Sequence, residues 1–172
     1  MLKNTLIICV TIVAFAIYFD RLRPKIIHQD IGDIDKIVVE KQQRILSLFS
    51  DGKHVKSYPI SLGREPIGHK TQEGDGKTPE GTYFIDWVHP NSSYSKAILV
   101  SYPNASDKQN AAAMGVAPGG DIMIHGMPNG FGWLYPSLSK TDWTEGCIAV
   151  SNTAMEEIES SVKIGTKIII KP

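Results

Sequence analysis

Cysteine is scarce in this sequence, and its scarcity limits the kinds of site the chain can build. Only Cys9 and Cys147 occur among the 172 residues. They do not form a C-x-x-C pair, and the histidines at positions 54, 69, 89 and 125 are too scattered for local metal-ligand spacing. The sequence also lacks a glycine-rich phosphate-binding motif. We therefore predict neither a metal site nor a cofactor.

Neither sign of charge dominates the sequence. Lys and Arg together number 18, as do Asp and Glu, so the formal net charge is zero. Without residues 1–25 the chain keeps 14 basic and 17 acidic side chains, a net charge of −3. A mildly acidic domain has no general field that would recruit nucleic acid, so no nucleic-acid partner is predicted.

Long hydrophobic runs are absent apart from one at the N-terminus. Residues 5–19 are uncharged and follow Lys3. As a helix this run covers roughly 22 Å, less than the roughly 30 Å of a bilayer's hydrocarbon core. That length is typical of a signal-peptide core, but cleavage after Ala16 would leave an apolar mature terminus. We expect residues 1–25 to be an uncleaved membrane anchor in preference to a signal peptide, residues 26–35 a linker, and residues 36–172 an exported domain.

Export narrows the possible roles of Cys147. An oxidising compartment favours disulfides, yet the exported part has no second cysteine with which to form one. A lone thiol there is either buried and inert or a nucleophile. Gly146 permits a sharp backbone turn before the thiol, and His125, at the end of a strand-like run, can act as its base. These neighbours favour the nucleophile.

The body of the chain has the hydrophobic alternation of β-strands. We predict strands over residues 36–40, 44–49, 54–63, 82–88, 96–102, 121–125, 147–150 and 166–171. One clear helix is predicted over residues 153–162, capped by Ser151 or Asn152, and a shorter one over 106–114, capped by Ser106 or Asp107. The expected fold is a mainly β sandwich or barrel with one or two short helices and no second domain.

A long predicted loop covers residues 63–81, GREPIGHKTQEGDGKTPEG. Its five glycines and two prolines exclude a helix or a central strand. A loop of nineteen residues in a compact domain is commonly functional. For His69 and Lys70 we expect solvated positions in preference to catalysis, with binding of a charged peptide left open.

Aromatic side chains gather between His125 and Cys147. The segment contains Phe131, Trp133 and Tyr135, with Trp143 further on, and is interrupted by glycine and proline. These four rings cannot all be the core of one regular element. A lid or groove wall and ordinary loop packing are comparable interpretations.

Three short motifs, taken in order, resemble the L,D-transpeptidase catalytic domain (the YkuD family). They are Thr78-Pro79-x-Gly81, Ile124-His125-Gly126 and Thr144-x-Gly146-Cys147-Ile148, and the resemblance extends over roughly residues 34–172. His-Gly or Gly-Cys alone is a weak signal, whereas the ordered set is strong. The resemblance implies a β-rich domain whose cysteine attacks a peptidoglycan stem peptide, expels its terminal D-alanine and forms a thioester. An amine or water then resolves that thioester.

The resemblance also implies roles for individual residues of this chain. Cys147 is the nucleophile, His125 the general base, and the carbonyl of Gly126 orients that base. The backbone N–H groups of Gly146 and Cys147 form the oxyanion hole. Thr144 occupies the small hydroxyl position of the family motif.

Two positions depart from the family pattern. Many members have a histidine two residues before the cysteine, where this chain has Glu145, and an arginine two residues after it, where this chain has Ala149. A methyl group cannot replace an arginine that binds a carboxylate. Arg64 or Lys70 is the candidate replacement. The full predicted substrate-binding set is Thr144, Glu145, Trp143, Tyr135, Arg64 and Lys70.

The predicted function is cysteine-dependent acyl transfer on peptidoglycan stem peptides, in a periplasmic or cell-envelope domain tethered to the membrane by its N-terminal segment. The alternative is hydrolysis at the same site, as an L,D-carboxypeptidase or amidase. A wall-binding module without activity is a third interpretation, which the presence of both Cys147 and His125 disfavours. The sequence predicts no particular oligomeric state.

Overall fold

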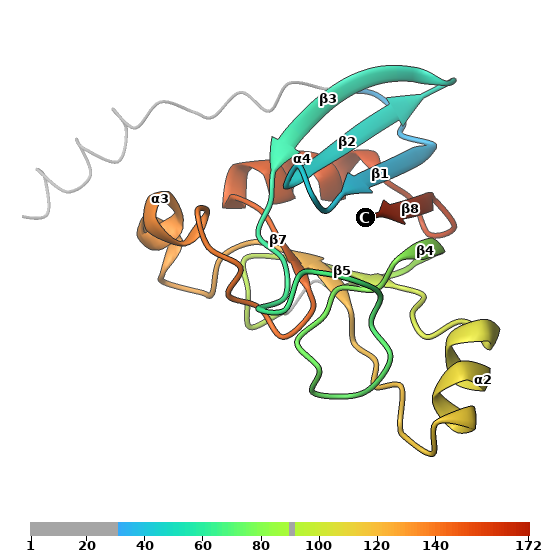
Figure 1. The fold of residues 1–172 in the computed structure, drawn as a ribbon. Coiled ribbons are helices and arrows are strands. Elements are labelled where there is room, and N and C mark those ends of the chain that lie inside the picture. Colours follow the sequence, from blue (N-terminus) through green and yellow to red (C-terminus); the bar gives the residue numbers. More distant parts are fainter. Residues whose placement is uncertain (1–30, 90–91) are drawn as a thin grey trace, which may run out of the picture.

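A single curved sheet organises the chain. The computed structural model describes residues 31–89 and 92–172. Their strands form one eight-stranded sheet in the order β3-β2-β1-β8-β4-β5-β6-β7, which curves into a half-barrel (Figure 1). The strands are β1 (Lys36–Glu40), β2 (Ile45–Ser50), β3 (Lys53–Pro59), β4 (Gly81–His89), β5 (Ala97–Val100), β6 (Met123–His125), β7 (Ile148–Ala149) and β8 (Lys167–Lys171). The mainly β fold and its eight strands are confirmed.

The described residues contain more helix than the sequence predicted. The helices are α2 (Ala105–Ala113), the 3₁₀ turn η1 (Gly132–Leu134), α3 (Tyr135–Leu138) and α4 (Asn152–Ser161). The two predicted helices are α2 and α4, whereas η1 and α3 lie inside the aromatic segment, where no helix was expected. The prediction of one or two helices was therefore too low.

The sheet has two halves that β8 joins. β1, β2 and β3 form an antiparallel meander, and β8 lies between β1, its parallel partner, and β4, its antiparallel partner. β4 then continues into the second half, where it pairs with β5, and its register shifts between Ile85 and Trp87. Because β1 is an inner strand, Ile37, Val38 and Val39 are all buried and do not alternate with exposed residues.

Helix α4 connects both halves of the sheet. It packs against β5 and β6 of the second half. From the first half, Tyr58 of β3 donates to Glu157 of α4 at 2.7 Å and Lys56 pairs with the same carboxylate at 2.5 Å. The core between these elements includes Leu46, Ile98, Ile124, Ile158 and Ile168, each 0% exposed.

The predicted helix caps were partly right. Ser151 caps α4, since its side chain accepts from Ala154 N, which decides between the two predicted candidates. The prediction for α2 was wrong: Asn104 is the cap, and its side chain accepts from Asp107 N while the Asp107 carboxylate accepts from Asn104 N. This reciprocal pair satisfies two backbone donors and starts the helix two residues earlier than a cap at Ser106 would.

Part of the predicted N-terminal organisation can be compared with the fold. Residues 1–25, the predicted anchor, lie outside the described residues, as do residues 26–30 of the predicted linker. Ile34, which was assigned to the linker, is 4% exposed and its N–H donates to Ser161 O, so it belongs to the packed domain. Within residues 31–89 and 92–172, no helix has the length and apolar character needed to cross a membrane.

Candidate active site

The two residues that carry the predicted chemistry lie on neighbouring strands at one edge of the sheet. β6 ends at His125, and β7 begins directly after Cys147. The two strands are parallel, with His125 opposite Ala149. Side chains alternate along a strand, so Cys147, two residues before Ala149, faces the same side of the sheet as His125. The fold thus brings a thiol and an imidazole to one face.

His125 is buried, and a hydrogen bond orients its ring. Its side chain is 1% exposed, and its Nδ1 lies 2.7 Å from the carbonyl oxygen of Gly126. A carbonyl only accepts, so Nδ1 carries the proton and Nε2 of the neutral ring is the atom that can accept one. Burial lowers the pKa of His125, and the Gly126 carbonyl opposes this effect. The ring is therefore neutral near pH 7.

Two aromatic rings hold the imidazole in place. The Tyr94 ring stacks on it at a tilt, with centroids 4.0 Å apart. The Trp143 ring meets it edge to face, with centroids 5.7 Å apart. Such contacts fix the plane of the imidazole and keep bulk water from it.

Cys147 rests as a neutral thiol. Its side chain is partly exposed, and its Sγ lies 3.5 Å from the carbonyl oxygen of Asp121. Burial raises the pKa of Cys147, and the Asp121 carboxylate adds to the rise, whereas the Met123 backbone N–H and the Lys70 ammonium act in the opposite direction. A thiol with a raised pKa needs a base before it can attack a carbonyl carbon.

Thr144 organises the turn that leads into Cys147. Its hydroxyl donates to Cys147 O at 2.7 Å and accepts from Gly146 N at 3.1 Å. Thr144 is 5% exposed, so it shapes the turn and does not offer its hydroxyl to a ligand in solution. The Gly146 N–H, assigned to the oxyanion hole from the sequence, is directed at this hydroxyl. The Cys147 N–H remains the candidate donor from this turn.

The long loop packs against the same turn, backbone to backbone. Gly146 has a φ of +129°, and a Cβ there would lie 2.6 Å from Lys77 O. A Cβ on Gly63 would lie 2.1 Å from Gly76 O and 2.9 Å from the Gly146 Cα. The Arg64 N–H also donates to Thr144 O at 3.0 Å. Glycine is needed here because three backbone segments meet with no room for side chains.

The prediction of a solvated position was wrong for Lys70, whereas His69 is partly exposed, with 29% of its side chain accessible. Lys70 is 3% exposed, and its ammonium donates to Asp75 Oδ1 at 2.9 Å and to Gln72 O at 3.0 Å. His69 Nε2 lies 3.2 Å from an Asp107 oxygen, and its Nδ1 accepts from Glu80 N at 3.0 Å. Both side chains hold the loop together, and the Lys70 charge reaches the thiol without lying in open solvent.

Arg64 forms an exposed ion pair with Glu145, which is close in sequence to Cys147. The Arg64 Nη2 contacts Glu145 Oε1, and their side chains are 58% and 67% exposed. Glu145 lies two residues before Cys147, and the Arg64 backbone N–H donates a hydrogen bond to Thr144, the residue before Glu145. An exposed pair of this kind is weak and readily exchanges partners.

The aromatic segment divides into buried and exposed parts. Trp143 and Tyr135 are half-buried; Trp143 contacts His125, whereas Tyr135 lies on α3. Phe131 and Trp133 are 50% and 73% exposed. Of these four aromatic residues, Trp143 is the one whose ring packs against His125.

Two residues at this site were missed in the sequence. Asn152, considered only as a helix cap, accepts from Met127 N at 2.8 Å through Oδ1 and so ties α4 to the strand that carries His125. Tyr94 was assigned no role, because the sequence gave no signal of its contact with His125. Such contacts depend on tertiary packing, which local patterns do not encode.

The described residues show no metal cluster. Across residues 31–89 and 92–172, no three His, Cys, Asp or Glu side chains are grouped so that they could hold a metal ion.

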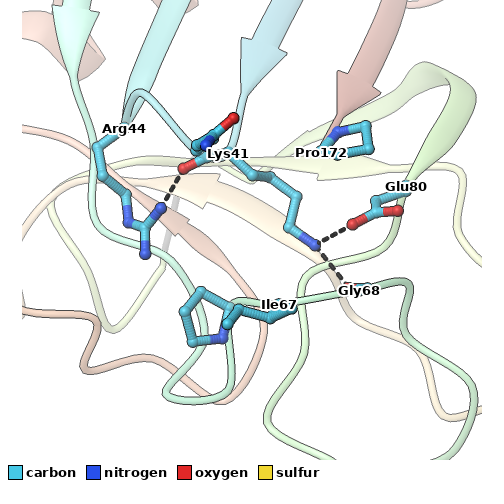
Figure 2. Close-up of a pocket in the computed structure, with 8 residues that line it drawn as sticks. Lys41, Arg44, Ile67, Gly68, Glu80 and Pro172 are labelled. Carbon is cyan, nitrogen blue, oxygen red and sulfur yellow. Dashed lines mark hydrogen bonds and ion pairs between the residues drawn. The ribbon is translucent and has the colours of Figure 1, made fainter.

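A cavity of about 460 Å³ lies beside the long loop (Figure 2). Neither His125 nor Cys147 is among the residues that line it. It is lined by Lys41, Gln42, Arg44, Pro66, Ile67, Gly68, Glu80 and Pro172.

Comparisons with known proteins identify the family and the individual proteins that this chain resembles. A family model described as the L,D-transpeptidase catalytic domain (YkuD) matches residues 34–170. YafK of Escherichia coli (strain K12), whose name assigns it to the L,D-transpeptidases, is 30% identical over 129 residues, which are 71% of this chain and 44% of YafK.

Two solved structures are also similar. The helical cell shape determining protein Pgp2 from Campylobacter jejuni aligns with a TM-score of 0.62 at 27% identity, covering 81% of this chain and 48% of Pgp2. Bd1075 from Bdellovibrio bacteriovorus aligns with a TM-score of 0.59 at 28% identity, covering 83% of this chain and 49% of Bd1075. The chain thus spans about half the length of these relatives or less.

Proposed function

The chain belongs to the L,D-transpeptidase catalytic domain family, and from that premise we propose that it is a cysteine acyltransferase acting on the stem peptides of peptidoglycan. The observation that supports this most directly is the placement of neutral His125 and thiol-bearing Cys147 on one face of the parallel pair β6 and β7. A base and a nucleophile on one face are what acyl transfer through a thioester requires.

The proposed reaction begins with the thiol. His125 Nε2 takes the proton from Cys147 Sγ as the sulfur attacks the carbonyl carbon of a stem-peptide amide. The C–N bond of that amide then breaks, the proton passes from His125 to the departing amine, and a thioester on Cys147 remains. In the second half, an acceptor amine attacks the thioester, loses its proton to His125 and releases the cysteine as a thiol.

Backbone donors stabilise the oxyanion in this proposal. The Cys147 N–H is the candidate from the turn that Thr144 holds, because the Gly146 N–H already donates to the Thr144 hydroxyl. The Lys70 ammonium adds positive potential near the sulfur, since it lowers the pKa of Cys147 against the effect of burial. Lys70 thus acts through its charge and is not the carboxylate-binding group considered from the sequence.

Arg64 is the residue we assign to the substrate carboxylate. It is exposed, and its partner Glu145 is an exposed carboxylate that a substrate carboxylate can replace. The released Glu145 is then available for the ammonium group of an acceptor amine. From the aromatic segment we assign Trp143, which contacts His125, the exposed Trp133 and the half-buried Tyr135 to substrate binding.

Hydrolysis is the second candidate reaction. Ala149 stands where the family has an arginine, and Glu145 stands where it has a histidine, so the features that select the acceptor differ in this chain. Water resolving the thioester would make the protein an L,D-carboxypeptidase or amidase. In either case we propose an envelope location, with residues 1–25 as the membrane anchor.

Mass spectrometry of the full chain incubated with peptidoglycan tetrapeptide fragments tests the proposal. A cross-linked dimer that the wild-type protein makes and Cys147→Ala does not would support transpeptidation. Shortened monomers alone, again absent with Cys147→Ala, would support hydrolysis. Fragments that stay unchanged, together with binding of the protein to intact peptidoglycan, would move the assignment to a non-catalytic wall-binding module.

A further inference from the structure

A buried lysine joins the first half of the sheet to the long loop. Lys41 follows β1 directly, is 2% exposed, and extends its ammonium into the loop (Figure 2). Nζ donates to Gly68 O at 2.6 Å, to Thr78 O at 3.0 Å and to Glu80 Oε1 at 2.7 Å. All three donors of the ammonium are therefore used, and every acceptor belongs to residues 68–80.

This arrangement fixes the two ends of the loop relative to each other. Gly68 lies near its start, and Thr78 and Glu80 lie at its end, just before β4. Burying an ammonium is costly, and burial lowers the pKa of Lys41 while Glu80 opposes that effect. A buried ammonium is tolerated when specific hydrogen bonds compensate for its lost hydration. The three hydrogen bonds of Lys41 together define one conformation of the loop.

Apolar packing does little to hold this part of the loop. Ile67, next to Gly68, is 85% exposed. The cavity of about 460 Å³ that Lys41 lines lies between the end of β1 and loop residues 66–68. Since the loop borders a cavity and exposes its isoleucine, the ammonium supplies the contact that a hydrophobic side chain would supply elsewhere.

The other side of the loop touches the turn that carries the nucleophile. Thr78 Oγ1 accepts from Gly63 N at 3.1 Å, and Lys77 O lies 2.6 Å from the point where a Cβ on Gly146 would be. The Thr78 carbonyl held by Lys41 and the Lys77 carbonyl against Gly146 are consecutive along the chain. The two carbonyls lie in adjacent peptide planes that meet at the Cα of Thr78. Because Thr78 is 0% exposed and its side chain is hydrogen-bonded to Gly63 N, a shift of its carbonyl also displaces the Lys77 carbonyl.

We propose that Lys41 is a positioning residue for the reaction of Cys147. Its ammonium holds residues 68–80 so that the Lys77 carbonyl packs against Gly146 and sets the position of the Cys147 backbone N–H that faces the oxyanion. The inference rests on the proposed function of Cys147 and adds a residue outside the site. It also separates two properties: the base lies at the end of β6 and the thiol directly before β7, whereas the position of the oxyanion donor depends on the loop.

That separation defines the experiment. Lys41→Met keeps a side chain of similar length and removes the three donors. Lys56→Met is the matched control, because Lys56 also pairs with a carboxylate, Glu157, but on α4. Two rates are measured on the full-length proteins: acylation of Cys147 by a carbapenem, followed by intact mass, and alkylation by iodoacetamide between pH 5 and 10. Acylation requires the oxyanion donors, whereas alkylation requires only the thiol and its base.

We expect Lys41→Met to slow acylation at least tenfold while its alkylation profile with pH matches the wild type, and Lys56→Met to change neither rate. Wild-type acylation in Lys41→Met would overturn the proposal, and so would a parallel loss of acylation and alkylation, which indicates general loosening. If Lys41→Met does not fold, Glu80→Gln replaces it, with a several-fold slower acylation expected and an unchanged rate contradicting the proposal.

A wild-type protein that the carbapenem does not acylate would count against the proposed function and leave the loop contact to be judged separately. The rate of amide hydrogen exchange over residues 63–81 measures directly whether Lys41 holds the loop. Faster exchange in Lys41→Met than in Lys56→Met supports the positioning role, and equal exchange in the two variants overturns it.

Discussion

Replacing Gly146 with alanine tests the close packing next to the nucleophile. The backbone φ of +129° is one that L-residues rarely adopt, and the new Cβ would lie 2.6 Å from Lys77 O. Holding an alanine at a positive φ costs about 1–2 kcal/mol. Inserting a methyl group against a backbone carbonyl, which cannot rotate away, costs about 1–3 kcal/mol more. We therefore expect Gly146→Ala to lower the free energy of unfolding by about 2–5 kcal/mol.

Gly115→Ala is the matched control for backbone strain alone. Gly115 has a φ of +69°, and a Cβ there meets no atom within 4 Å. Only the conformational cost applies, so a loss of about 1–2 kcal/mol is expected. Because Gly115 follows α2 and lies apart from the turn before Cys147, its substitution should leave acylation of Cys147 at the wild-type rate.

Urea denaturation and the rate of carbapenem acylation provide the two readouts. The wild-type rate is the reference, and the Gly146 variant should fall at least tenfold below it, because relief of the clash moves the Cys147 N–H. Equal stability losses in the two variants, combined with an unchanged acylation rate for Gly146→Ala, would refute the reasoning.

Three further predictions concern the chemistry of the site. Cys147→Ala and His125→Ala should each abolish formation of a covalent acyl-enzyme, read by intact mass, while circular dichroism stays that of the wild type; adduct on Cys147→Ala would show that another residue is the nucleophile. Burial lowers the folded-state pKa of His125 below its usual 6.5, so the unfolded chain takes up a proton first as the pH falls and stability should decline below pH 6.5. Urea midpoints between pH 8 and 5 should fall more steeply for the wild type than for His125→Gln, and parallel profiles would contradict the assignment. Arg64→Gln should raise KM for a stem peptide several-fold, and Glu145→Gln should lower it. Both should change the free energy of unfolding by less than about 1 kcal/mol, because the ion pair is exposed. An unchanged KM in Arg64→Gln would show that Arg64 does not bind the substrate.

The sequence predicted the strands well because hydrophobic alternation is local. KIVVE and the Asp51-Gly52 turn between the second and third strands are complete signals within a few residues, and β1, β2 and β3 appear where expected. The family was likewise evident from short motifs around His125 and Cys147. Boundaries were less accurate, as with α2, because the cap at Asn104 depends on a reciprocal bond with Asp107.

The predictions that failed concern charged residues in the long loop. Lys70 was expected in solvent because lysine is usually exposed, yet Asp75 receives its ammonium inside the loop. Lys41 gave no sequence signal, since its three acceptors lie 27 to 39 residues away. Burial of a charge is decided by partners distant in sequence, and a local pattern cannot supply them.

The position of β8 makes the joining of the two halves of the sheet a late step in folding. β8 follows every other strand along the described part of the chain, yet it lies in the middle of the sheet order, and within those residues it alone pairs with both β1 and β4. The meander and the half that contains His125 and Cys147 therefore remain separate sheets until residues 167–171 have been inserted between them. Such long-range closure is slow compared with formation of local hairpins. Because β6 and β7 both lie in the second half, their pairing does not wait for β8, whereas the attachment of that half to the meander does.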